Sequence, residues 1–142
     1  MRALLDVNVL LALLDRAHMH HLRARGWLES NAQHGWASCP LTQNGFVRII
    51  SQPKYPAPIA TADAISLLHG ATATSLHEFW PADISLLEES VADRSRIYGP
   101  RQITDIYLLA LAVRRNGRLV TFDDGIPFDA VPGAEARNLV AI

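Results

Sequence analysis

The chain has 142 residues, of which 49% are hydrophobic, and this predicts one domain, residues 1–142, with enough apolar material for a core and none for a second domain. The first apolar run carries Asp6 and has no basic leader or small-residue cleavage site, so we expect a cytoplasmic protein with no signal peptide and no membrane anchor. The net charge of −1 excludes a general attraction to nucleic acid, so a polyanionic substrate would need a local basic surface or bound cations.

The chain opens with a short apolar run that leads to a single carboxylate. Ala3 to Leu5 fits a buried parallel strand, which places Asp6 at its carboxyl end. Asn8 fits the N-cap of a helix from Val9 to Leu14. Because ligands of open α/β sheets bind beyond the carboxyl ends of the strands, we expect Asp6 to project into the functional crevice.

Three histidines and one cysteine in the first third of the chain raise the question of a metal site. His18, His20 and His21 have no neighbouring Cys, Asp or Glu at ligand spacing, so they are predicted to be a solvated helix start. Cys39 is the only cysteine, which excludes an intramolecular disulfide and a CxxC site, and we expect it to be a small buried side chain.

Helices and short strands are predicted through the middle of the chain. In the helix that begins at Pro40, Asn44 and Arg48 share one face. Gly45 within it costs roughly 1 kcal/mol relative to alanine, so either another group approaches the backbone or the side chain is dispensable. In chain order we expect a helix ending near 33–35, a strand at Trp36–Ser38, helices at 40–50 and 62–69 (the latter capped by Thr61 and stopped by Gly70), a strand within 77–81, and a helix capped by Asp83 that carries Ile84 to Val91.

The last third begins with a basic loop and continues into an apolar helix. Asp93 to Arg101 contains three arginines and is predicted to be a mobile loop that faces a substrate: Arg94, Arg96 and Arg101. Thr104 can cap the next helix, with Asp105 in its first turn and Gly117 as its stop. A strand over Arg118–Phe122 then leads to Asp123 and Asp124, and Ala136 to Val140 can supply a final strand.

Three carboxylates thus meet at one place in the predicted topology. Asp6 and Asp123 each end a strand, and Asp105 opens the helix before the second of these strands. Uncompensated carboxylates repel one another, so such a cluster indicates a bound cation. Oxygen ligands favour Mg²⁺ or Mn²⁺, and metal-activated water attacking a phosphodiester is the chemistry that this donor set predicts.

These segments resemble PIN-domain nucleases, and more closely the VapC-type toxins of bacterial type II toxin–antitoxin pairs. The likeness rests on Leu-Leu-Asp6-Val-Asn8, on Thr104-Asp105, and on Val-Thr121-Phe-Asp123, and it extends to the segments around Asn44 and Trp80. The resemblance implies a PIN-like three-layer α/β fold with a mostly parallel sheet between helices. It also implies a Mg²⁺-dependent endoribonuclease that is a homodimer and is neutralised by a cognate VapB-type antitoxin.

The resemblance also suggests supporting residues and one departure. Asp6, Asp105 and Asp123 are the expected catalytic and metal-binding residues, and the possible supporting residues are Asn8, Asn44, Thr121 and Asp124. Many PIN domains carry a glutamate in the third helix where Gly45 stands here, with Asn44 beside it, so one metal ion is a firmer expectation than two. Asp124 is expected to point away if Asp123 points inward.

Other hypotheses fit the sequence less well. A haloacid-dehalogenase-type phosphatase needs a second aspartate at the position of Asn8, and a receiver domain needs a lysine at the end of a late strand, where Lys54 cannot serve. The remaining alternative is a non-catalytic RNA- or protein-binding module with a structural metal ion. We also expect the apolar helices at 9–14 and 106–113 to pack partly against a second copy.

Overall fold

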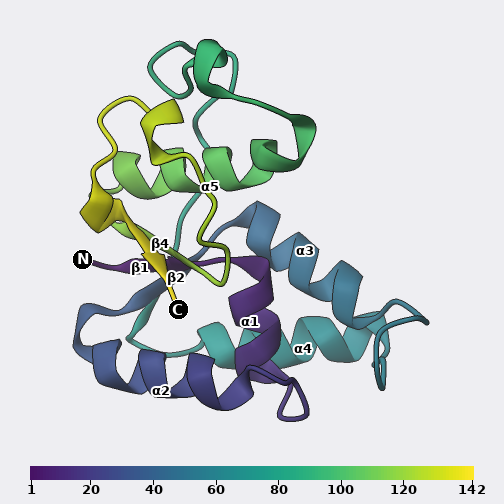
Figure 1. Cartoon of the computed structure of the whole chain (residues 1–142). Helices are drawn as coiled ribbons and strands as arrows, with labels where there is room; N and C mark the ends of the chain where they lie inside the picture. The colour runs from purple at the N-terminus through teal and green to yellow at the C-terminus, as the bar shows by residue number, and fades with distance from the viewer.

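Short apolar segments pair into one wholly parallel sheet at the centre of the molecule (Figure 1). The computed structural model describes residues 1–142. In the order β3-β2-β1-β4-β5, β1 lies in the middle, and its Leu4 is paired with Ala37 of β2 and Leu119 of β4. The strands are β1 Ala3–Leu5, β2 Trp36–Ser38, β3 His77–Phe79, β4 Arg118–Thr121 and β5 Leu139–Ala141.

Alternate strand residues supply two separate cores, one on each face of the sheet. Leu4 and Leu119 belong to the core under α5, whereas Leu5 and Val120 belong to the core under the other four helices. Figure 1 shows α5 on one side of the sheet and α1 to α4 on the other. The helices are α1 Val7–Leu14, α2 His21–Asn31, α3 Pro40–Ile50, α4 Thr61–Thr72 and α5 Ile103–Arg114.

Single turns of 3-10 helix complete the connections. They are η1 Ala32–His34, η2 Arg94–Arg96, η3 Pro100–Gln102, η4 Phe128–Ala130 and η5 Ala136–Asn138. The predicted fold class, an α/β sheet of mostly parallel strands with helices on both faces, is confirmed. None of the helices combines the length and the hydrophobicity that crossing a membrane requires.

The start of α1 differs from the prediction. The helix begins at Val7, and Asp6 is its N-cap: the backbone of Asp6 is extended and its Oδ1 accepts a hydrogen bond from the Val7 N–H at 2.7 Å. Asn8, the predicted cap, is an exposed residue of the first turn. The aspartate at the strand end therefore does the capping itself, which shortens the connection between β1 and α1.

The helix predicted after Asp83 is absent. Its apolar residues Ile84 and Val91 are buried against α5 from a segment of turns and bends. The Asp83 carboxylate instead pairs with Arg115 at 2.9 Å, and the Ile84 carbonyl accepts a hydrogen bond from the Tyr107 hydroxyl. The Asp83 carboxylate and the Ile84 carbonyl, which would cap or stabilise a local helix, are thus bonded to residues on or just after α5.

Other boundaries also shift. Thr61 is the first residue of α4 rather than its cap, and Gly70 lies within that helix instead of stopping it. Thr104 does not cap α5, because η3 leads directly into a helix that begins at Ile103. Residues 136–138 form a 3-10 turn, so the last strand starts only at Leu139.

Candidate functional site

Asp6 is a nearly buried carboxylate held by two hydrogen bonds at the carboxyl edge of the sheet. Only 8% of the residue is exposed. Its Oδ1 accepts from the Val7 N–H, and its Oδ2 accepts from the Thr121 hydroxyl at 2.8 Å. Burial raises the pKa of Asp6 more than these hydrogen bonds lower it, and the charge of Asp123 adds to the rise.

Thr121 connects the two central strands at this edge. It is the last residue of β4, is buried, and donates to Asp6 while its Oγ1 accepts from the Asp123 N–H at 3.1 Å. The predicted supporting role of Thr121 therefore has a geometric basis: one hydroxyl fixes both the Asp6 carboxylate and the backbone that carries Asp123.

Asp105 lies in the first turn of α5 and is half-buried. No hydrogen bond or ion pair joins its carboxylate to the protein, in contrast to Asp6. Burial, together with the charges of Asp6 and Asp123, raises its pKa to about 6. The structure thus brings the three predicted aspartates within electrostatic reach of one another and leaves one of them without a partner.

Asp123 and Asp124 follow β4 as predicted, but unlike Asp6 they are exposed. Asp123 is exposed, and its Oδ1 accepts from the Gly125 N–H at 2.7 Å in the turn after the strand. Asp124 is exposed and has no hydrogen-bond partner in the protein. The side chains of Asp123 and Asp124 are thus available to solvent at the same edge where Asp6 is enclosed.

The donor set suits a hard divalent cation, although the side chains as they stand are not gathered around one point. No group of three or more His, Cys, Asp or Glu side chains is close enough to hold a metal ion. The chemistry of the site nevertheless fits one: an unpartnered half-buried carboxylate and two further carboxylates whose charges oppose its ionisation. Asp6, Asp105 and Asp123 are therefore the residues that could hold Mg²⁺ or Mn²⁺.

Helix α3 packs against α1 directly behind Asp6 at Gly45. A Cβ atom at position 45 would lie 2.7 Å from Val7 Cγ2, so a larger side chain there requires the Val7 side chain to move. Asn44 is exposed and lines a hollow of about 280 Å³ with residues of α4. The supporting role predicted for Asn44 has no contact with the three aspartates to support it.

Gln43 is the polar residue of α3 that sequence reasoning missed. It is half-buried, and its Nε2 donates to Ser38 Oγ, at the carboxyl end of β2, at 2.9 Å. β1, which is paired with β2, ends at Leu5 just before Asp6, so Gln43 lies at the sheet edge that carries the aspartates. Its position four residues after Cys39, in the first turn of a helix that begins at a strand end, was the available signal.

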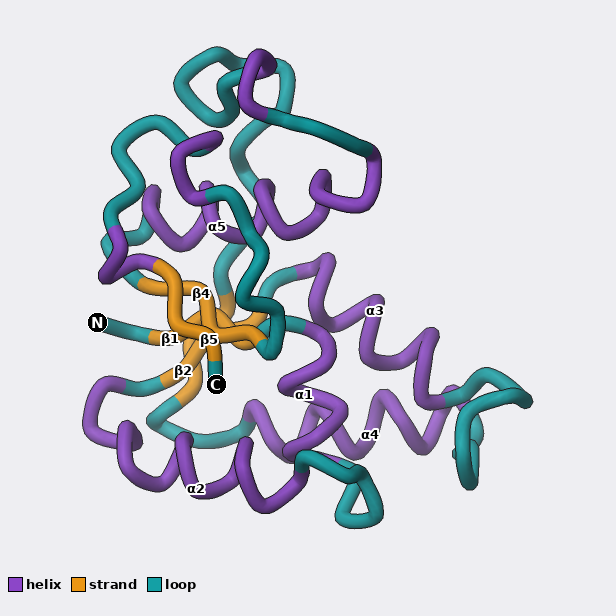
Figure 2. Tube along the Cα trace, viewed as in Figure 1, coloured by secondary structure: helices purple, strands orange, loops and turns teal.

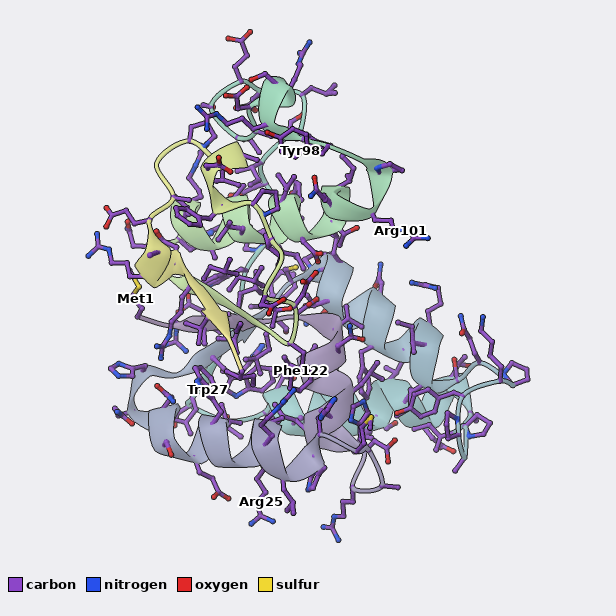
Figure 3. The ribbon with its side chains drawn as sticks, viewed as in Figure 1. Met1, Arg25, Trp27, Tyr98, Arg101 and Phe122 are labelled. Atoms are coloured by element: carbon purple, nitrogen blue, oxygen red, sulfur yellow. The ribbon has the colours of Figure 1, made fainter.

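The three arginines of the basic segment do not form one free surface. Arg96 is held by Asp93 at 3.3 Å and by Asp129 at 2.9 Å. Arg94 and Arg101 are exposed and make no ion pair, and Figure 3 shows Arg101 directed away from the molecule near the start of α5. The segment is built from two 3-10 turns, η2 and η3, and leads directly into Asp105.

The chain is similar in sequence to known ribonucleases along its whole length. A family model described as PIN domain matches residues 3–134. Ribonuclease VapC44 of Mycobacterium tuberculosis is 60% identical over 142 residues, which is all of both chains. Ribonuclease VapC38 of the same organism is 50% identical over 125 residues, covering 87% of this chain and 86% of that protein.

The fold also matches a solved toxin–antitoxin structure. That structure is the VapBC2 complex of Rickettsia felis bound to a DNA fragment from its promoter, and the matched chain gives a TM-score of 0.61 with 19% sequence identity. The match covers 100% of this chain and 98% of that one. At this identity the likeness is one of fold, and it agrees with the sequence relatives.

Proposed function

The chain belongs to the PIN domain family, and on that premise we propose that it is a metal-dependent endoribonuclease acting as the toxin of a toxin–antitoxin pair. The observation that carries the proposal is the set of three carboxylates at one sheet edge, in which Asp105 is half-buried, lacks any partner and has its pKa raised to about 6. Relatives named ribonuclease along the full length of the chain support the substrate class.

Asp6, Asp105 and Asp123 are the catalytic residues in this proposal, and they would hold Mg²⁺ or Mn²⁺. Such an ion, when bound, supplies an acidified water as nucleophile and neutralises charge on the phosphodiester. Thr121 holds the Asp6 carboxylate in place through its 2.8 Å hydrogen bond. Asn8 and Asp124 are exposed and lie close to the aspartates in the chain, and in this proposal they would make secondary contacts to water or substrate.

RNA binding is assigned to the exposed arginines that precede Asp105. Arg94 and Arg101 have free guanidinium groups and lie on the segment that leads into α5. Arg96 contributes to RNA binding only indirectly in this proposal, because its two ion pairs hold η2 against η4. Because the net charge of −1 gives no general attraction to a polyanion, such a local positive surface would add to the attraction of the bound cation.

The partners follow from the same premise. We infer that a VapB-type antitoxin neutralises this chain, since its relatives are named as VapC ribonucleases and the matched fold is that of a VapBC complex. An arginine from such a partner could pair with Asp6 and Asp105 and so compete with the cation. A homodimer is part of the proposal, although α5 does not require one: its outer face is covered by Ile84, Val91 and other residues of the same chain.

The test compares Asp105→Asn with Asp63→Asn, a matched change of an exposed first-turn aspartate in α4. Wild type and Asp63→Asn should cleave labelled RNA with Mg²⁺ or Mn²⁺ and be inactive with EDTA. Asp105→Asn should lose more than about 100-fold in cleavage, beyond the loss typical of a residue that only orients a ligand, and should bind Mn²⁺ more weakly by calorimetry. Unchanged Mn²⁺ affinity in Asp105→Asn would refute the metal site. Tight Mn²⁺ and RNA binding by wild type without cleavage would instead favour the non-catalytic module.

A further inference from the structure

A row of flat side chains begins at Phe122, the residue before Asp123. The Phe122 ring lies 5.0 Å from the His20 ring, and the His20 ring lies 5.7 Å from that of His18, measured between centroids. On Phe122, the guanidinium carbon of Arg23 sits over the ring, 4.8 Å from its centroid. We refer to His18, His20, Phe122 and Arg23 as the ring row.

The backbone at the end of β4 connects the ring row to the candidate site. Phe122 stands between Thr121, which hydrogen-bonds Asp6, and Asp123. Its side chain packs on the core under α1 to α4, so it faces α2 while Thr121 faces Asp6. Figure 3 labels Phe122 beside α1, above α2.

The histidine turn that completes the ring row is also anchored. His21 Nδ1 makes a 2.7 Å hydrogen bond with the Ala12 carbonyl near the end of α1, and His18 Nδ1 accepts from the His20 N–H at 3.0 Å. The predicted solvated helix start is thus an ordered turn whose rings meet Phe122. These hydrogen bonds hold the turn, and the start of α2, including Arg23, lies against Phe122 just after β4.

Arg23 is available to a ligand, unlike its neighbour on the helix. It is exposed and forms no ion pair, whereas Arg25 is paired with Glu29 at 2.8 Å. An arginine held over an aromatic ring with its other face in solvent offers a flat cationic surface together with free N–H donors. Unpaired RNA bases stack on such guanidinium planes and on aromatic rings, and the donors suit a phosphate.

We propose that the ring row binds an unpaired base of the RNA next to the scissile phosphodiester, with the base stacked on Arg23 and Arg23 held in place by Phe122 and His20. The inference rests on the proposed ribonuclease function and adds to it a substrate requirement: the nucleotide at this position must be unstacked and single-stranded. Arg23 contacts the base, and Phe122 and His20 are positioning residues.

The experiment measures binding without cleavage, by fluorescence anisotropy in EDTA. The probes are a short single-stranded oligoadenylate and an abasic ribose-phosphate chain of the same length, which differ only in the bases. Arg23→Lys keeps the charge and removes the planar group, so it should weaken oligoadenylate binding roughly five- to tenfold, the loss of one base stack, and leave abasic binding unchanged. Arg23→Gln should weaken both. Phe122→Leu should behave like Arg23→Lys.

Phe79→Leu is the matched control, because this phenylalanine of β3 is 49% exposed and lies on an edge strand. It should bind both probes as wild type does. Arg23→Lys lies on the surface and should keep the wild-type circular dichroism, so the test holds even if Phe122→Leu fails to fold. Oligoadenylate binding by Arg23→Lys within twofold of wild type, or an equal loss on the abasic chain, overturns the inference. If wild type still cleaves RNA in that case, the proposed function stands alone, whereas a wild type that neither cleaves nor binds RNA ends both.

Discussion

Ser38 is a fully buried hydroxyl that links Gln43 to His77. Its Oγ accepts from Gln43 Nε2 at 2.9 Å and lies 2.8 Å from His77 Nε2. A neutral His77 ring whose Nε2 accepts the Ser38 hydroxyl proton satisfies both hydrogen bonds of this hydroxyl. Burial, together with the charge of Arg2, lowers the pKa of His77, in agreement with this assignment.

The lowered pKa of His77 predicts that the stability of the folded protein depends on pH. The folded pKa of His77 lies below the value of 6.5 expected when the chain unfolds, so the folded state binds fewer protons. Its contribution to stability is present above pH 6.5 and is lost as the pH falls from 6.5 through the folded pKa. Urea unfolding of wild type between pH 7.5 and about 5 should show this decline. His77→Gln, which can still accept the hydroxyl proton, should flatten it.

The control for His77→Gln is His34→Gln, at an exposed histidine in η1. That variant should follow the wild-type pH profile. A His77→Gln profile as steep as that of wild type would mean that other groups cause the acid loss of stability.

At the scale of elements, the contact between α1 and α3 is the tightest constraint near the site. Gly45 is buried, and a Cβ there would lie 2.7 Å from Val7 Cγ2. Val7 is β-branched and its N–H is bonded to Asp6, so it has little freedom to move aside. Any side chain at position 45 therefore requires Val7 to move, and the Gly45–Val7 contact favours glycine there.

Gly45→Ala should therefore destabilise the protein by about 1–2 kcal/mol, the cost of overpacking less the gain in helix propensity. Gly70→Ala is the matched change: Gly70 is also inside a helix, but nothing lies within 4 Å of its would-be Cβ, so this variant should gain about 0.5–1 kcal/mol. Urea midpoints give both values. Combining Gly45→Ala with Val7→Ala should recover part of the loss, and equal stability of the two glycine variants would contradict the contact.

The elements also show what the sequence could and could not predict. β1, β2 and α3 were predicted with their bounds, because apolar runs, Pro40 and the strand-end Asp6 are local signals. The absent helix after Asp83 was missed because Asp83 pairs with Arg115, which is distant in the chain. The cap at Asp6 was missed although its bond to the Val7 N–H is local, because Asn8 two residues later is an equally suitable cap residue. Figure 2 shows that loops and single helical turns cover the outer side of α5, an arrangement that periodicity does not encode.

As with the fold, the sequence predicted the parts of the candidate site that depend on local signals. Asp6, Asp105 and Asp123 follow from strand ends and a helix start, and the structure brings them within electrostatic reach. The ion pair of Arg96 with Asp129 and the contacts of the ring row with Phe122 join segments far apart in the chain, so no local pattern predicts them. Gln43 had a local signal in its position at the start of α3, but its bond to Ser38 follows only from the fold.

For the whole molecule, charge distribution decides how a chain of net charge −1 meets RNA. The double variant Arg94→Ala/Arg101→Ala should weaken RNA binding and lower its salt dependence by roughly 0.7 per lost phosphate contact, with little change in the rate of the chemical step. Anisotropy over a range of salt concentrations and single-turnover cleavage measure the two effects. Arg114→Ala, at the opposite end of α5 from Asp105, should leave the slope unchanged. A double variant with the wild-type slope would mean that these arginines are only solvated surface.

The position of β1 in the middle of the sheet bears on when the protein can become active during its synthesis. The hydrogen bond from Thr121 to Asp6 joins residues 115 positions apart, which a translating ribosome separates by on the order of ten seconds. Until β4 emerges, a nascent chain holds Asp6 without its hydroxyl partner, and Asp105 and Asp123 are not yet gathered beside it. If the three aspartates cut RNA as proposed, incomplete chains are inert, and a cell that makes this protein has that interval in which a finished inhibitor can meet it.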